Sequence, residues 1–263
     1  MALIKRDERS SHWYSRTGES CHTVIAKTTG LPRATNVTDA RKLGLIPSVT
    51  NVIGIKAKPA LNTWLQDNAI LAALNTPRYP GEVDGDYHSR IATVSDSIGK
   101  EAAEWGTLLH EQIEQYVTGG AFLGTGEILE YVADVERWIR ENVVTVISSE
   151  ESVVGDIGYA GRLDLYAMIK HGDGVRRAVI DFKSQKLRGK PKGNFYKEWE
   201  IQLAAYADCL REPGDELPLL VSIIIPSVNP GPVQVKVWEN GEGGLKAFKA
   251  CFALWCYEKG YEP

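Results

Sequence analysis

The sequence predicts an α/β fold with a mixed central β-sheet flanked by helices and an N-terminal helical decoration. Segments with apolar residues at helical spacing come first, then consecutive segments with strand-like alternation, then a helix and further strands. This order, which is not a regular alternation of strand and helix, is typical of a mixed sheet with helices packed on it. A chain of 263 residues is long for one domain and short for two, and we expect one domain.

Composition and charge limit the class of protein. The hydrophobic fraction is 43% and the charged fraction 24%, as in ordinary globular proteins. Because the net charge is −4, a polyanionic partner must be held by a local basic patch. The longest apolar runs, such as 217–225, are shorter than the roughly 20 residues of a membrane-spanning helix. The first residues lack the apolar segment of a secretory signal, so we expect a cytoplasmic protein without a membrane partner.

The first half of the chain predicts mostly helices. Residues 1–46 are polar and irregular, and residues 48–55 are apolar and β-branched. The segments that follow predict a helix over 58–74, with Pro59 in its first turn, a loop over 76–90, and helices over 95–117 and 127–142. Ser95 or Ser97 is expected to cap the third of these segments.

The second half of the chain predicts the sheet. The expected strands cover 143–154, 162–170, 177–183, 219–225 and 233–238, and the expected helices cover 197–210 and 244–261. The cysteines show no CxxC spacing, so we expect buried or free thiols at Cys21, Cys209, Cys251 and Cys256.

Two aspartates are expected to meet across a hairpin. Residues 171–174 read HGDG, a strong turn signal because glycine adopts the positive φ that such turns require. If the strands pair symmetrically about this turn, Asp164 and Asp181 lie directly opposite, with Cβ atoms about 4.5–5.5 Å apart. Side chains alternate along a strand, so Lys183 shares the face of Asp181.

Two interpretations of this arrangement remain open. Opposed like charges are destabilising unless a cation or a proton lies between them. The hairpin could face solvent, with Lys183 and nearby arginines offsetting the carboxylates. Alternatively, the carboxylates could bind Mg²⁺ or Mn²⁺, which prefer a few oxygen ligands and bridge to phosphate. Lys183 could then orient the attacking water or neutralise charge on a phosphate, and this pattern predicts phosphodiester hydrolysis.

Other residues extend the candidate site. Glu150 or Glu151 could supply a third carboxylate, although alternation along a strand excludes both together. His110 lies on the preceding helix and could be a further ligand or an ordinary helix residue. Gln202 and Tyr206 are four residues apart and share one helical face.

A basic segment follows the second strand of the hairpin. Residues 183–197 interleave aromatic and basic side chains, which suits a nucleic-acid backbone with unstacked bases, or else forms a merely solvated loop. Its basic residues beyond Lys183 are Lys186, Arg188, Lys190, Lys192 and Lys197.

The ordered set of motifs resembles the PD-(D/E)xK nuclease superfamily. His110, the glutamate pair, GYAGRLD ending at Asp164, IDFKSQK at 180–186 and QLAAY at 202–206 occur in the order found in RecB-type exonucleases. This group includes phage exonucleases and the mitochondrial genome maintenance exonuclease. The likeness covers about residues 100–210, and residues 48–64 look like the entry segment of phage members.

The resemblance implies a restriction-endonuclease-like core and a set of roles. It implies one nuclease domain over 1–263, with 1–95 as decoration and entry segment and 96–263 as catalytic core. Asp164, Asp181 and Glu150 would bind metal, Lys183 would be catalytic, and His110 would be a further ligand. Glu150 is favoured over its neighbour because SEESVV fits the family spacing. Substrate contacts are implied for Gln202, Tyr206, Lys186, Arg188, Ser48 and Thr50.

The implied activity is that of a Mg²⁺-dependent DNA exonuclease, with Mn²⁺ able to substitute, acting on single strands or duplex ends. A role in phage-type recombination or genome processing, beside a single-strand annealing or single-strand-binding protein, would follow. The alternatives are a structure-specific or restriction-type endonuclease and a non-catalytic nucleic-acid-binding subunit. The cysteines depart from the pattern of relatives with an iron-sulfur cluster, so no cluster is expected.

Overall fold

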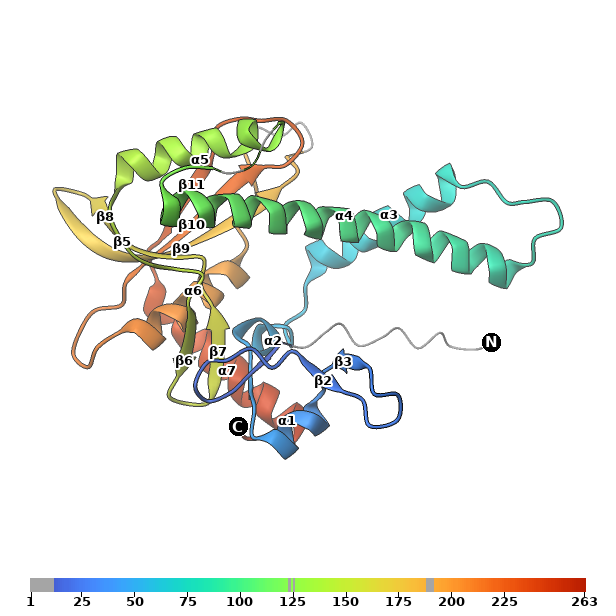
Figure 1. Cartoon of the computed structure of the whole chain (residues 1–263), viewed down its shortest axis with the longest axis horizontal. Helices are drawn as coiled ribbons and strands as arrows, with labels where there is room; N and C mark the ends of the chain where they lie inside the picture. Colours follow the sequence, from blue (N-terminus) through green and yellow to red (C-terminus); the bar gives the residue numbers. More distant parts are fainter. Residues whose placement is uncertain (1–11, 123, 125, 188–191) are drawn as a thin grey trace.

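The computed structural model describes residues 12–122, 124, 126–187 and 192–263 (Figure 1). The first half of the chain forms β1 (Trp13–Tyr14), β2 (Thr23–Ile25), β3 (Pro32–Ala34), α1 (Val37–Leu43), β4 (Ile46–Pro47), α2 (Val49–Ile53), α3 (Pro59–Asn75), α4 (Asp84–Gly119) and α5 (Ile128–Asn142). The second half forms β5 (Val143–Ser149), β6 (Ser152–Gly155), β7 (Tyr159–Arg162), β8 (Leu165–His171), β9 (Gly174–Gln185), α6 (Lys197–Leu210), β10 (Leu219–Pro226), β11 (Gln234–Trp238) and α7 (Gly241–Lys259).

The central sheet is mixed and has five strands in the order β11-β10-β9-β8-β5. Strands β9 and β10 are parallel and are connected through α6, whereas the other neighbours are antiparallel. The described part of the chain contains seven helices, of which α4, α5 and α6 pack directly on this sheet. The prediction of a mixed α/β fold with flanking helices is confirmed.

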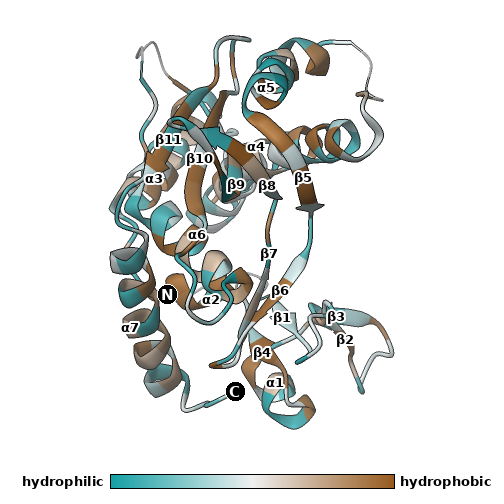
Figure 2. Cartoon of the chain, turned by 90° about the vertical axis from the view of Figure 1, so that its left-hand side faces the viewer, coloured by the Kyte–Doolittle hydropathy of each residue, from teal (hydrophilic) through white to brown (hydrophobic). Residues whose placement is uncertain are grey.

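Helices cover both faces of the sheet. On one face, α4 packs on β9 and α5 packs on β5 and β10, around a core that includes Ile180 and Phe182. On the other face, α6 packs over the side that carries Val179, and α7 packs on α6. Figure 2 shows β10 in the brown of apolar residues between these layers, and every residue of this strand is buried. Asp181 lies on the α6 side and is only 2% exposed, so the interpretation of a solvent-facing hairpin is wrong.

The β8–β9 hairpin has the predicted symmetric register. Its pairs run from His171 opposite Gly174 to Leu165 opposite Ile180. Gly172 occupies the turn with φ of 56°, a conformation that glycine adopts without strain. The next position in the same register brings Asp164 opposite Asp181.

The strands expected over 143–154 and 162–170 are each interrupted, and the prediction of continuous strands is wrong there. β5 and β8 stay in the central sheet, whereas β6 and β7 leave it and pair with each other. The interruption occurs at Glu150, whose positive φ of 51° turns the chain. Two backbone hydrogen bonds, from Glu150 N to Asp164 O and from Leu163 N to Glu151 O, hold the two interruptions side by side.

Part of the expected loop over 76–90 is helical, which corrects the prediction from residue 84 onward. Helix α4 begins at Asp84 rather than at a serine cap near residue 95, because Asp84 and Asp86 complement the positive helix N-terminus. The expected division between residues 95 and 96 therefore falls inside α4. Helices α3 and α4 pack together and project from the sheet (Figure 1).

Two segments for which the sequence predicted no definite element, residues 48–55 and the first segment of the chain, contain short helices and strands. Within the apolar segment 48–55, Val49–Ile53 form the short helix α2, whose N-cap is Ser48. The irregular first segment contains α1 and short strands, of which β1 and β4 pair and contact β7. Within the described residues, every helix is too short or too polar to cross a bilayer.

One glycine allows β7 to approach α6. A Cβ atom at Gly161 would overlap the ring of Tyr206, which is 4% exposed. The absence of a side chain at this position therefore places the Tyr206 ring directly against the β7 backbone. This contact sets the position of the α6 face that carries Gln202.

We expect Gly161→Ala to lower the free energy of unfolding by about 1–3 kcal/mol, because the added methyl group forces the buried Tyr206 ring to move. Chemical denaturation measures the change. Gly174→Ala is the matched control, since its added methyl group meets no atom within 4 Å, and its effect should stay within about 0.5 kcal/mol. Equal effects of the two substitutions would contradict the close packing at Gly161.

Candidate metal centre

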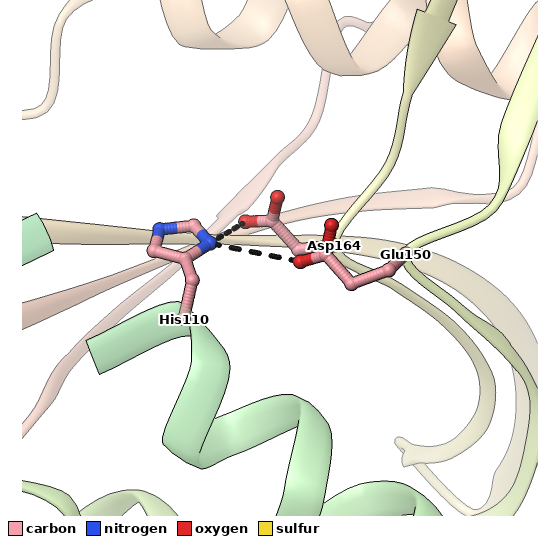
Figure 3. Close-up of side chains that lie close together, drawn as sticks. All are labelled: His110, Glu150 and Asp164. Carbon is pink, nitrogen blue, oxygen red and sulfur yellow. Dashed lines mark ion pairs between the residues drawn. The ribbon is translucent and has the colours of Figure 1, made fainter. Parts of the chain in front are cut away.

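Three potential ligands meet where β5, β8 and α4 come together. His110, Glu150 and Asp164 each offer a ligand atom, and these atoms lie within 4.8 Å of one another. His110 Nδ1 is 3.5 Å from Asp164 Oδ2 and 3.9 Å from Glu150 Oε1. Figure 3 shows both carboxylates pointing toward the imidazole ring from the chain segments opposite α4. The structure thus brings together three residues that are far apart in the sequence.

Asp181 adds a buried carboxylate beside this group. Its Oδ1 accepts a hydrogen bond from Lys183 Nζ at 2.7 Å. Its Oδ2 is buried and has no hydrogen-bond partner within the described part of the chain. A buried charged oxygen without a partner is costly, and a bound cation removes that cost.

The residues present fit a divalent cation. The carboxylate oxygens of the set suit Mg²⁺ or Mn²⁺, whereas the imidazole nitrogen is a ligand type that transition metals accept more readily than Mg²⁺. The unpartnered Asp181 Oδ2 supplies an acceptor that the described residues leave unused. The Asp164 carboxylate is held in place by a hydrogen bond, which its Oδ2 accepts at 2.7 Å from the backbone N–H of Phe182.

The charges of the cluster shift the pKa values of its members. Burial, together with the charge of Asp181, raises the pKa of Asp164 to about 6. Burial lowers the pKa of His110, but Asp164 and Glu150 outweigh it and raise that pKa to about 9. Burial likewise opposes a raised pKa at Lys183, yet Asp181 and Asp164 raise it. Both His110 and Lys183 are therefore protonated at neutral pH when no cation is bound.

Glu150 reaches the cluster because its backbone is strained. Among the described residues it is the non-glycine residue with a positive φ, a left-handed conformation that costs about 1–2 kcal/mol. The backbone bond to Asp164 O holds it there. The structure places Glu150 at the cluster, whereas Glu151 is exposed. Strain that surrounding contacts maintain in this way is typical of functional sites.

Arg162 belongs to the site although the sequence did not single it out. Its Nε forms an ion pair with Glu150 Oε2 at 2.7 Å, and its Nη2 lies 4.0 Å from Glu114 Oε1. The available signal was its place two residues before Asp164 in GYAGRLD. Its partner, Glu150, comes before β6 and is separate in the sequence from the GYAGRLD motif. The two residues meet because β6 and β7 pair with each other.

Gln202 and Tyr206 lie on the buried side of the cluster. Gln202 Nε2 donates to the Tyr206 hydroxyl at 3.1 Å, as their shared helical face predicted. Burial raises the pKa of Tyr206, and the charges of Asp181 and Asp164 add to this effect. The tyrosine hydroxyl therefore stays protonated and can act as a hydrogen-bond donor near the two aspartates.

Lys186, Ser48 and Thr50 are the other predicted contact residues that the structure describes. Lys186 is exposed just beyond β9, and Arg188 lies outside the described residues. Ser48 is 3% exposed, and its hydroxyl lies 3.0 Å from that of Thr50 and accepts from the Asn51 N–H. The Ser48 hydroxyl thus caps α2, and the Thr50 hydroxyl is its hydrogen-bond partner. All four cysteines are free thiols.

Comparisons with known proteins add no function to this geometry. No family model and no curated protein matches the chain. Among solved structures, it is similar to one described as the crystal structure of SSO0001, at 13% sequence identity, covering 75% of this chain and 87% of that chain, with a TM-score of 0.31. A likeness at that TM-score carries no argument about fold or activity.

Replacing Glu150 tests the strain at the cluster. We expect Glu150→Gly to be more stable than Glu150→Ala by about 1 kcal/mol, because glycine adopts the positive φ without the clash of a Cβ atom. Equilibrium unfolding in urea measures both variants. At Glu151 the order should reverse, since alanine restricts the unfolded chain without strain there. The same order at both positions would contradict a strained Glu150.

The pKa of His110 tests the charge arrangement. In the metal-free protein we expect it near 9, and we expect Asp164→Asn to lower it, because burial then outweighs the remaining negative charge. Histidine ring signals followed by NMR against pH give both values. His12, whose pKa is lowered by burial and by His22, serves as the internal control. An unchanged His110 pKa in the variant would argue against the contact with Asp164.

The same shift has a consequence for stability. A histidine whose folded pKa is raised stabilises the folded state fully below its ordinary pKa of 6.5, and this contribution is lost as the pH rises through about 9.

Proposed function

We propose that the protein is a Mg²⁺-dependent DNA exonuclease, with Mn²⁺ able to substitute, built on a restriction-endonuclease-like core. One observation carries the proposal: the buried and unpartnered Asp181 Oδ2 lies beside His110, Glu150 and Asp164, with Lys183 on the same face. Carboxylates alone are common on protein surfaces. A partly buried set that includes the buried Asp181, with a lysine hydrogen-bonded to this aspartate, suits the chemistry of phosphodiester hydrolysis.

The chain's own groups have distinct roles in this proposal. Asp164, Asp181 and Glu150 would hold the cation, and His110 would contribute its Nδ1 or orient the glutamate. The cation, when bound, would supply Lewis-acid activation of water and neutralise phosphate charge. Lys183 keeps a protonated Nζ next to Asp181, where it can orient the attacking water or stabilise negative charge on the phosphate.

Binding of the DNA strand would rely on local positive charge, since the net charge is −4. Lys186 and Lys192 are exposed within the segment that links β9 to α6. Hydrogen bonds between the Gln185 and Asn194 positions hold the ends of this segment together. Gln202 and the protonated Tyr206 hydroxyl would position the substrate or Lys183 from the α6 side of the sheet.

The preference for DNA ends follows from the resemblance of the motifs to RecB-type exonucleases. On that basis the protein would act in the cytoplasm, in phage-type recombination or genome processing. A single-strand annealing or single-strand-binding protein would be its natural partner.

Cleavage of end-labelled single-stranded and duplex DNA, with Mg²⁺, Mn²⁺ or EDTA, tests the proposal. We expect metal-dependent release of short products by the native chain and a loss of about 100-fold or more in Asp181→Asn and Lys183→Met. Glu200→Gln is the matched control, because Glu200 is also buried and paired with a lysine, Lys197, outside the cluster. Full activity in Asp181→Asn would rule out the assigned centre.

The same assay separates the alternatives. Cleavage of closed circular DNA would identify an endonuclease, whereas degradation of linear DNA alone supports an exonuclease. Binding of DNA without cleavage under every metal would favour a non-catalytic subunit.

A further inference from the structure

Arg162 is the most accessible charged group at the candidate metal centre. It ends β7, and its side chain keeps 52% of its surface exposed. The side chains of Glu150 and Asp164 keep only 17% and 15%, and that of Lys183 keeps 25%. A ligand that arrives from solvent therefore meets Arg162 before it meets the less exposed carboxylates of Glu150 and Asp164.

The guanidinium of Arg162 has unused donors. Its contact with Glu150 joins one nitrogen, Nε, to one oxygen, Oε2, at 2.7 Å. The approach of Nη2 to Glu114 Oε1, at 4.0 Å, is too long for a hydrogen bond. Within the described part of the chain, no acceptor engages both terminal nitrogens. A guanidinium offers five N–H donors in a planar fork that matches phosphate oxygens in pairs.

Glu150 serves two cationic neighbours from its two oxygens. Oε2 faces Arg162, while Oε1 faces His110 Nδ1 at 3.9 Å. A divalent cation held by His110, Glu150 and Asp164 would replace Arg162 as the main counter-charge of the glutamate. Because like charges repel, the guanidinium would then gain by turning toward solvent and toward an anion bound there.

We propose that Arg162 binds a phosphate of the nucleic-acid substrate, and that Glu150 withholds it from that role until a divalent cation takes over the charge of the glutamate. The inference rests on the proposed function, because it names a residue that meets the phosphodiester beside the same centre. It makes cation binding and substrate binding mutually reinforcing, with Arg162 as the group that links them.

The test measures DNA binding without cleavage. Glu150→Gln removes the negative charge that holds Arg162, whereas Asp164→Asn removes an equal charge from the same cluster and leaves the Arg162–Glu150 ion pair in place. Affinity for a fluorescently labelled single-stranded oligonucleotide is measured in EDTA, at a pH well above the pKa of Asp164. We expect Glu150→Gln to bind about five-fold or more tightly than Asp164→Asn.

Double variants show whether Arg162 causes the gain. In Glu150→Gln combined with Arg162→Ala the gain should vanish, and with Arg162→Lys part of it should return, since lysine keeps the charge but not the planar fork. Thermal melts establish that each variant is folded.

Equal affinities of Glu150→Gln and Asp164→Asn would overturn the inference, because lowered negative charge alone would then explain both. A gain that persists without Arg162 would also overturn it. Failure of the proposed function is a separate result, namely absence of metal-dependent cleavage by the native chain.

Discussion

The buried carboxylate of Asp181 is the feature on which the candidate centre depends. It stands on a strand inside the sheet, where α6 excludes solvent from one face and α4 and α5 cover the other. Lys183 compensates one of its oxygens and leaves the second without a partner among the described residues. The surrounding groups, Asp164 opposite and His110 on α4, are arranged around this oxygen, which no described residue engages in a hydrogen bond.

The break in the strands around Glu150 serves this arrangement. A continuous β5–β6 strand would alternate its side chains across the sheet and would not turn Glu150 toward His110. The positive φ at Glu150 changes that direction, and backbone bonds to the Leu163–Asp164 segment maintain it. The diverging ladder of β6 and β7 also carries Arg162 to the rim of the centre. The strained backbone of Glu150, its ion pair with Arg162 and its position as a potential ligand thus all result from this one interruption of the strands.

Much of the fold was predictable because its signals are local. Helix α6 has the predicted bounds of 197–210, and the start of α3 at Pro59 follows from the preference of proline for a first helical turn. The start of α4 was mispredicted, because Pro, Gly and Asp before residue 90 indicate a loop as readily as a helix N-terminus. The end of β5 was mispredicted because the polar run SSEES, although poor in strand-forming residues, is followed at once by further β-branched residues and was included in one strand. Contacts from β7 and Asp164, not the residue itself, determine its conformation.

The sequence by itself predicted the register that opposes Asp164 to Asp181, because symmetric pairing about a glycine-containing two-residue turn gives this register, and the structure has it. It likewise placed Lys183 on the face of Asp181, and Gln202 beside Tyr206. Only the tertiary structure decided that Glu150 rather than Glu151 faces His110, and that Arg162 pairs with this glutamate. These contacts join segments distant in sequence, so they depend on how α4 packs on the sheet and where β6 and β7 leave it, which no local pattern encodes.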